Sequence, residues 1–178
     1  MRWTVHGERG VYESEWMRLR LADVELPDGV RFEHHVVRFP RAASGTVVHD
    51  PERGLLLLWR HRFITDTWGW EIPAGGIDAG ETPEEGAARE TLEETGWRPG
   101  PLELMVRYHP SNGATDQEFN LFVADGATHV GDPHDPFEAE RIEWVPVDEA
   151  RKLVEEGQVQ DGLSLTALLW FLAFRVRG

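Results

Sequence analysis

The chain has 178 residues, the length of one domain, and its 40% of hydrophobic residues are sufficient for a buried core. It has no cysteine, which excludes disulfides, thiol catalysis and cysteine metal sites. Its formal net charge is −14, and it shows no basic patch of the kind that nucleic-acid-binding proteins usually carry. No apolar run approaches a membrane span, and the N-terminus lacks the apolar core of a signal peptide. We therefore expect a cytoplasmic protein that binds neither membranes nor nucleic acids.

The first part of the chain is predicted to form strands. Residues 1–17 show no clear period, whereas residues 18–22 alternate, and the turn at Asp28-Gly29 leads into an extended stretch at 30–39. These segments predict an antiparallel hairpin. The next elements are predicted as a break at 40–45, strands at 46–49 and 54–59, a loop at 60–69, an extended segment at 70–72 and a glycine-rich loop at 75–80.

A well-capped helix follows this loop. Thr82 is a good N-cap, Pro83 suits the first helical position, and Glu85 completes a capping box with Thr82, while Gly96 is a good stop. The acidic first turn, with Glu84 and Glu85, is explained by the helix dipole alone. The remaining elements are predicted as strands at 102–109, 118–124 and 141–147, loops at 110–117 and 126–139, a helix at 148–156 capped by Asp148 and ended by Gly157, and a final helix at 164–176. This order predicts an α+β fold with a mixed sheet.

Three glutamates of the first helix are candidate metal ligands. Glu90, Glu93 and Glu94 lie at positions i, i+3 and i+4, so they share one helix face, where like charges repel. A divalent cation removes this conflict, and ligands that are all oxygen favour Mg²⁺ or Mn²⁺. Arg89 and Glu81 are placed to hold each other and to orient the carboxylates. The competing interpretation, a solvated acidic face, does not explain the whole spacing.

The spacing resembles the signature of the Nudix family, the Nudix box. It reads Gly75, five residues, Glu81, seven residues, Arg89-Glu90, two residues, Glu93-Glu94, one residue, Gly96. Thr91 departs from the aliphatic residue of the family, which affects helix packing rather than the ligand face. The resemblance implies an α/β/α sandwich around a mixed sheet, here preceded by an N-terminal antiparallel hairpin. It also implies hydrolysis of a diphosphate that links a nucleoside to a second group.

The same resemblance implies a role for each box residue. Glu90, Glu93 and Glu94 correspond to metal ligands, and Arg89 and Glu81 to groups that support catalysis. Metal ions bridge the oxygens of a diphosphate, neutralise charge in the transition state and lower the pKa of a bound water. An acidic site of this kind binds its anionic substrate through the cations.

Outside the box, the chain resembles ADP-ribose pyrophosphatases more weakly. Residues 70–75 are similar to the segment that leads into the box of this subfamily, where the carbonyl at the Ala74 position also meets a metal. Residues 110–117 are similar to the loop after the box, although His109 and Gln117 replace its usual Ser and Glu. The residues expected to contact the substrate are Arg60, Arg62, Trp70, Gly75, Gly76 and Pro110.

The general base of this subfamily is a glutamate on a mobile loop before the last strand, and two residues are candidates here. Aligning Ile142 with that strand points to Glu138, with Glu140 close behind. The alternative is that both are solvated loop acids. The implied mechanism is that Mg²⁺ and the glutamate activate a water, which attacks one phosphorus and releases AMP and ribose 5-phosphate.

Aromatic residues and oligomeric state also have two interpretations. Trp68, Trp70, Phe32 and Tyr108 are candidates for stacking on an adenine, but each taken alone is more often a core residue. The final helix is interpreted as core or as a dimer face. The resemblance implies a homodimer that pairs through residues 18–39, within a single domain (1–178) made of N-terminal strands (1–40) and a Nudix core (41–178).

Other functions stay open beside hydrolysis of ADP-ribose. A hydrolase of the same class can act on a nucleotide sugar such as GDP-mannose, on NADH or on a dinucleoside polyphosphate. A non-catalytic Nudix module that senses ADP-ribose or a nucleotide belongs to a different class. Such modules tend to lose box glutamates, and all of them are present here. The favoured prediction is therefore a Mg²⁺-dependent hydrolase of ADP-ribose.

Overall fold

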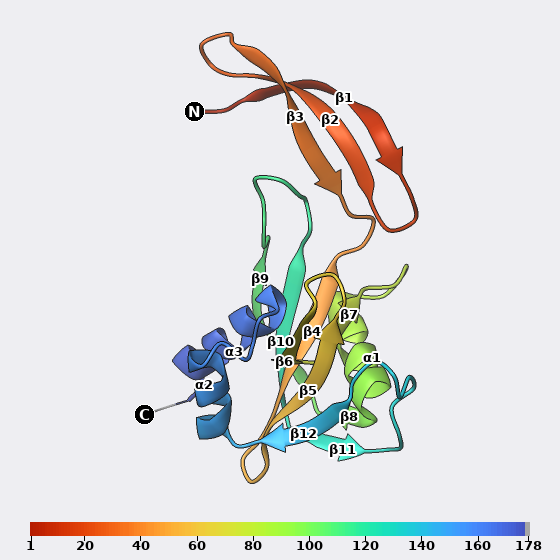
Figure 1. Cartoon of the computed structure of the whole chain (residues 1–178), viewed down its shortest axis with the longest axis vertical. Helices are drawn as coiled ribbons and strands as arrows, with labels where there is room; N and C mark the ends of the chain where they lie inside the picture. The colour runs from red at the N-terminus through yellow and green to blue at the C-terminus, as the bar shows by residue number, and fades with distance from the viewer. Residues whose placement is uncertain (177–178) are drawn as a thin grey trace. The chain divides into compact units, whose positions relative to one another are not determined.

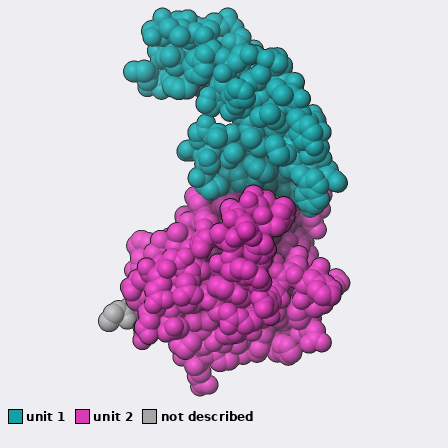
Figure 2. All heavy atoms as spheres, in the orientation of Figure 1, with its two compact units in different colours: residues 1–42, 109–118 teal, residues 43–108, 119–178 magenta. Residues whose placement is uncertain are grey.

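The computed structural model describes residues 1–176, and this part of the chain contains twelve strands and three helices (Figure 1). In chain order these are β1 (Thr4–Glu13), β2 (Arg18–Glu25), β3 (Arg31–Arg38), β4 (Ala43–Asp50), β5 (Gly54–Arg62), β6 (Thr67–Glu71), β7 (Ala74–Gly76), α1 (Pro83–Thr95), β8 (Trp97–Pro99), β9 (Leu102–Tyr108), β10 (Phe119–Asp125), β11 (Ala127–His129), β12 (Arg141–Val145), α2 (Val147–Glu155) and α3 (Gly162–Phe174). They form two compact units, coloured separately in Figure 2: residues 1–42 with 109–118, and the rest. No helix of the described chain is long and apolar enough to cross a membrane.

The first unit is built on an antiparallel sheet in the order β1-β2-β3. The hairpin predicted from residue 18 onward is confirmed, but the sheet has a further strand, since β1 lies in the region where we found no period. All ten residues of β1 are exposed, so no buried face imposes alternation on them. Register shifts beside Gly7 and Gly10 also break the period of two.

Residues 109–118 belong to this unit although they follow β9 in the chain. The Val37 N–H donates to the Ala114 carbonyl at 2.9 Å, and the Phe39 N–H donates to Asp116 Oδ1 at 2.8 Å. The carbonyl of Val37 accepts from the Asp116 N–H at 3.3 Å. The loop after β9 is therefore held along the end of β3, and the chain crosses between its two units three times.

The second unit is a mixed sheet in the order β12-β5-β4-β10-β9, with β6 paired to β5 and β7 paired to β4. Strands β4 and β10 run parallel, and the other pairs of this sheet are antiparallel. The β4–β5 turn ends at Gly54, where φ is +98° and an added Cβ would lie 2.1 Å from the Val145 carbonyl oxygen. Only glycine fits this position without displacing β12.

Successive residues of β4 show that helices cover both faces of the sheet. An added Cβ at Gly86 of α1 would lie 3.1 Å from Ser44 Oγ, whereas one at Gly45 would lie 2.9 Å from a methyl carbon of Leu163 in α3. Figure 1 shows α1 on one side of the sheet and α2 with α3 on the other. The main core lies on the α3 side and includes Val47, Leu55, Leu57, Leu121, Leu168 and Phe171. The predicted α/β/α sandwich with a mixed sheet is confirmed.

Some predicted boundaries were wrong because tertiary pairing decides them. Six of the ten residues predicted as a loop at 60–69 belong to β5 and β6, whose hairpin turn has Asp66 in the left-handed conformation (φ +52°). Strand β4 starts inside the predicted break, because Ala43 pairs with β7 and β10. The short strands β7, β8 and β11 were also missed, since three residues carry too little pattern.

Two helix starts also differ from the prediction. Asp148 does not cap α2, whose N-cap is Pro146 without a side-chain bond; Asp148 lies in the first turn, where its charge still favours the dipole. Helix α3 starts at Gly162, because Asp161 caps it by accepting the Ser164 N–H at 2.8 Å.

Candidate active site

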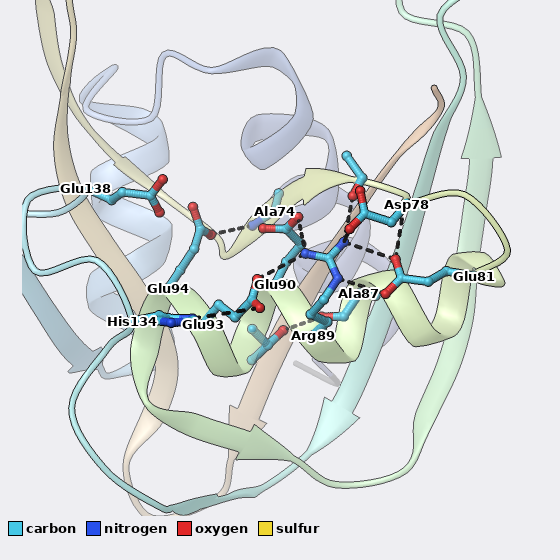
Figure 3. Close-up of polar contacts among 12 residues, drawn as sticks. Ala74, Asp78, Glu81, Ala87, Arg89, Glu90, Glu93, Glu94, His134 and Glu138 are labelled. Carbon is cyan, nitrogen blue, oxygen red and sulfur yellow. Dashed lines mark hydrogen bonds and ion pairs between the residues drawn. The ribbon is translucent and has the colours of Figure 1, made fainter. Parts of the chain in front are cut away.

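The box residues are presented by α1, whose predicted caps are confirmed. The Glu85 N–H donates to Thr82 Oγ1 at 3.2 Å, and the Thr82 N–H donates to Glu85 Oε2 at 2.8 Å, which completes the capping box. At the other end Gly96 takes the left-handed conformation, and its N–H donates to the Leu92 carbonyl at 2.8 Å. Local sequence thus sets the helix that carries the glutamates (Figure 3).

Arg89 is the centre of the partly buried half of the site. Its Nε and Nη2 donate to the two carboxylate oxygens of Glu81 at 2.8 and 3.0 Å, which confirms their predicted pairing. Nη2 also donates to the Gly76 carbonyl at 2.8 Å, and Nη1 donates to Glu90 at 2.8 Å and to Glu93 at 3.0 Å. The hydrogen bond to Glu81 and the neighbouring carboxylates raise the pKa of Arg89, so it stays charged.

Glu94 is the buried member of the glutamate set, with 5% of its side chain exposed. One carboxylate oxygen accepts from the Ala74 N–H at 2.8 Å, and the other accepts from Arg60 Nη1 at 2.8 Å. Burial raises the pKa of Glu94 to about 7, although Arg60 opposes the shift. Burial likewise raises the pKa of Glu90, against Arg89. Both carboxylates therefore sit where additional positive charge is favourable.

The chemistry of this donor set suits a divalent cation. All predicted ligands are oxygens, which Mg²⁺ prefers. Gly75 leaves room for the Glu90 carboxylate because it has no side chain: an added Cβ would lie 2.2 Å from Glu90 Cδ. Within residues 1–176 no three Asp, Glu or His side chains converge as a ready metal site. Instead, Arg89 Nη1 donates to both Glu90 and Glu93. Arg89 Nη1 bonds one oxygen of each carboxylate, and the ligand roles of Glu90 and Glu93 stay predictions.

Arg60 and Arg62, two residues apart in β5, pair with the carboxylates of Glu94 and Glu71. Arg62 makes a two-pronged pair with Glu71, with Nε–Oε1 2.9 Å and Nη2–Oε2 2.5 Å. Glu71 is buried, and Arg60 Nη1 lies 3.8 Å from it. The sequence assigned no role to Glu71, although it stands in the segment that leads into the box. Arg62 is half-exposed, so it has a free face for an anionic ligand, whereas Arg60 is buried.

The two candidate bases have different surroundings. The Glu138 carboxylate lies 3.7 Å from Arg60 Nη2, and Figure 3 shows it directed toward Glu94. Its negative charge contributes to the raised pKa values of Glu90 and Glu94. The Glu140 N–H donates to the Trp59 carbonyl at 2.9 Å, which extends the pairing of β12 with β5. The arrangement favours Glu138 as the group that shares the site with the box glutamates.

The predicted substrate contacts are spread over different surroundings. Trp70 is 6% exposed and packs against Trp59 with ring centroids 5.4 Å apart, as its core interpretation requires, while Trp68 is 45% exposed. Tyr108 is partly buried, and its hydroxyl donates to the Gly162 carbonyl at 3.3 Å. Gly75 and Gly76 lie in β7 beside Ala74, whereas Phe32 and Pro110 belong to the other compact unit.

Two residues that sequence reasoning did not single out hold the segment before the box. The Ile72 N–H donates to Ser164 Oγ at 3.1 Å, and that hydroxyl donates to Asp161 Oδ2 at 2.8 Å. The Trp70 N–H donates to the Gln158 carbonyl at 2.9 Å. The backbone N–H groups of Trp70, Ile72 and Ala74 thus donate to Gln158, Ser164 and Glu94, respectively, and not to a neighbouring strand. The Asp-x-x-Ser pattern of an N-cap was the available signal.

Comparison with known proteins identifies the family. The NUDIX domain profile matches residues 39–166, and the profile of the nucleoside diphosphate sugar hydrolase N-terminal domain matches residues 3–37. The chain belongs to the Nudix family, whose members are hydrolases of nucleoside diphosphate derivatives that generally use divalent metal ions. Its relatives support a Nudix pyrophosphohydrolase similar to ADP-ribose pyrophosphatases.

Those relatives differ in the substrate that they name. The CMP-5'-(N-acetyl-N-hydroxy-3-aminopropyl)phosphonate hydrolase of Streptomyces rubellomurinus is 45% identical over 158 residues, covering 89% of this chain and 76% of its own. The ADP-ribose pyrophosphatase of Bacillus subtilis is 30% identical over 160 residues, covering 89% of this chain and 86% of its own. A solved ADP compounds hydrolase matches the fold with a TM-score of 0.84 and 22% identity, covering 100% of this chain and 98% of its own.

Proposed function

We propose that the protein is a Mg²⁺-dependent hydrolase that cleaves the diphosphate of a nucleoside diphosphate conjugate, with ADP-ribose as the first candidate. The observation that carries the proposal is the convergence of Glu94 and Glu138 on Arg60 beside the box glutamates Glu90 and Glu93. Mn²⁺ is the alternative cation, because its oxygen preference is similar. The relative from Bacillus subtilis supports ADP-ribose as the substrate.

The residues divide the reaction between them. Glu138 acts as general base: it takes a proton from the attacking water as the new O–P bond forms and the bond to the leaving phosphate oxygen breaks. Arg62 uses its exposed face to hold a phosphate oxygen of the substrate. A bound Mg²⁺ supplies neutralisation of the diphosphate charge and activation of water. With ADP-ribose, the products are AMP and ribose 5-phosphate.

A second candidate substrate is a cytidine nucleotide joined to a phosphonate. The relative from Streptomyces rubellomurinus favours it, since that protein is 45% identical over 89% of this chain. The profile that matches residues 3–37 favours a nucleotide sugar, such as GDP-mannose. All of these compounds present a nucleotide phosphate to the cation that the same carboxylates would hold, so the proposed chemistry is the same for each of them.

A phosphate-release assay tests the proposed function. Purified protein, with Mg²⁺ and then Mn²⁺, is given ADP-ribose, a CMP–phosphonate conjugate, GDP-mannose, NADH and diadenosine polyphosphates, and added phosphatase releases phosphate from any monoester product. We expect the highest kcat/KM with ADP-ribose. A preference for another compound reassigns the substrate within the class. Inactivity on every compound with both metals contradicts catalysis and favours a nucleotide-sensing module, which ligand binding then tests.

Replacing Glu138 with glutamine should lower kcat about 10²- to 10⁴-fold, because the amide cannot accept the proton. Metal affinity should change little, since Glu138 is not among the predicted ligands. Steady-state kinetics with Mn²⁺ binding measured by electron paramagnetic resonance checks both values. Glu140→Gln is the matched control and should keep most activity. If Glu140→Gln loses the activity instead, the base is two residues further along.

We also infer that the protein forms a homodimer through its N-terminal sheet. All ten residues of β1 are exposed, and they include Val5 (59%) and Tyr12 (57%). An exposed strand with apolar side chains favours pairing with another chain, and a second copy supplies a matching surface. Sedimentation equilibrium is expected to give twice the chain mass, and the variant with Val5→Lys and Tyr12→Lys the mass of one chain. A wild-type monomer would rule this out.

A further inference from the structure

Arg60 is a buried cation between the two halves of the candidate site. Only 7% of its side chain is exposed, and arginine is rarely buried so deeply without partners. Nη1 donates to Glu94 at 2.8 Å, and Nε donates to the backbone carbonyl of Glu138 at 3.0 Å. Nη2 lies 3.7 Å from the Glu138 carboxylate. Arg60 thus touches a predicted metal ligand on α1 and the residue proposed as the base.

The contacts of Arg60 differ from those of the neighbouring Arg62, which pairs with a single carboxylate. Arg62 lies two residues further along the same strand and neutralises Glu71 through its two-pronged pair. Arg60 Nη1 lies 3.8 Å from Glu71 and only 2.8 Å from Glu94, so the closer contacts of Arg60 are those with Glu94 and Glu138. The edge of its guanidinium that carries Nε and Nη2 faces Glu138, and the remaining nitrogen faces Glu94. The planar group fixes the angle between the two contacts.

The segment that Arg60 holds has its other anchors on either side. The His134 N–H donates to the Glu93 carbonyl at 2.7 Å, and the Glu140 N–H donates to the Trp59 carbonyl at 2.9 Å. Between them the chain makes a turn whose Phe137 is 94% exposed. The bond from Arg60 to the Glu138 carbonyl ties this turn to the sheet at the residue that carries the proposed base.

We propose that Arg60 is a positioning residue, which sets the placement of Glu138 relative to Glu94. This proposal rests on the proposed function, since it assumes that Glu138 acts there. It differs from the expectation that Arg60 binds the substrate, because its burial and its existing partners leave little surface for a phosphate. Misplacing a reacting group by about 1 Å can cost about 10²-fold in rate. Loss of Arg60 should therefore reduce kcat without weakening substrate binding.

The test compares Arg60→Gln, Arg60→Lys and the control Arg62→Gln, which removes the same charge from the same face of β5. For both Arg60 variants we expect kcat to fall about 10- to 100-fold, with KM within about threefold of wild type. Amide hydrogen exchange over residues 130–140 should accelerate about tenfold, and Arg62→Gln should leave this exchange unchanged. Mn²⁺ affinity should stay equal or increase, because a cation beside Glu94 is removed or loosened.

A double-mutant cycle decides whether Arg60 acts through Glu138. In the Glu138→Gln background, Arg60→Lys should cost less than about twofold in kcat, since the group that it positions is already inactive. An additive loss, unchanged exchange over 130–140, or a raised KM with normal kcat each overturns the proposal. Full recovery of rate and protection in Arg60→Lys also overturns it, because charge alone would then suffice.

Two measurements keep the outcome independent of the proposed function and of folding. Hydrogen exchange needs no substrate, so it decides the role of Arg60 in holding residues 130–140 even if the wild type cleaves none of the compounds tested. Circular dichroism establishes which variants fold. If Arg60→Gln is unfolded, Arg60→Lys, which retains the buried charge, supplies the comparison with Arg62→Gln.

Discussion

Replacing Glu94 with glutamine is expected to reduce turnover at least about a thousandfold, equivalent to about 4 kcal/mol of transition-state stabilisation. The carboxylate is buried, and it is held by the Ala74 N–H and Arg60 on its two oxygens. Glutamine has the same shape but lacks the charge that a divalent cation requires. The amide retains one of the two hydrogen bonds, so the loss in stability should be about 1 kcal/mol. Steady-state rates and a thermal melt measure the two effects.

The first turn of the same helix supplies the matched control. Glu84 is exposed and contributes through the helix dipole, so Glu84→Gln removes an equal charge from α1 without touching the site. Its rate should stay within about twofold of wild type. Near-normal turnover in Glu94→Gln, together with near-normal turnover in Glu93→Gln, contradicts the metal assignment. An unfolded Glu94→Gln would instead assign this carboxylate a structural role.

Replacing Gly75 with alanine is expected to weaken Mn²⁺ binding about 10- to 100-fold while the fold remains intact. An added Cβ would lie 2.2 Å from Glu90 Cδ and 2.4 Å from each carboxylate oxygen. The clash falls on the end of a flexible side chain, so Glu90 can turn away at little cost to stability. It then leaves the face that it shares with Glu93 and Glu94. Electron paramagnetic resonance of bound Mn²⁺ and a thermal melt separate the two effects.

A cycle with Glu90→Gln tests the cause of this loss. If Gly75→Ala acts by displacing Glu90, the double variant should bind Mn²⁺ no more weakly than Glu90→Gln alone. Additive losses would show that Gly75 acts independently, for instance on the substrate. Gly162→Ala is the control, since a Cβ there meets nothing within 4 Å, and its Mn²⁺ affinity should equal that of wild type.

The contrast between Gly75 and Gly54 shows why the prediction for Gly75→Ala concerns function rather than folding. At Gly54 an added Cβ would lie 2.1 Å from the backbone oxygen of Val145, and φ is +98°. A side chain there would therefore displace strand β12 and strain the backbone of residue 54. At Gly75 the neighbour is a side chain that can rotate. Glycine is therefore required at the β4–β5 turn by the fold and at β7 by the position of a predicted ligand.

The features that the sequence alone determined depend on residues that lie close together in the chain. The capping box of Thr82 and Glu85, the stop at Gly96 and the pairing of Arg89 with Glu81 were predicted and are observed. Each involves groups within one helix or the turn before it, where spacing decides geometry. The shared face of the box glutamates was predicted from the same periodicity. The spacing of the box resembles that of the Nudix family, to which the chain belongs.

Only the tertiary structure decided how distant segments complete that site. Arg60 lies in a strand that its polar neighbours had predicted as a loop, and Glu71 lies in the strand paired with it. Ser164 comes from a helix start far along the chain. The Glu138 carboxylate lies 3.7 Å from Arg60 Nη2, whereas the Glu140 N–H extends the pairing of β12 with β5. Strand β1 has no buried face to leave a pattern. Local spacing therefore determined the helix and its chemistry, whereas contacts across the sheet, which no local period encodes, decided the partners that position it.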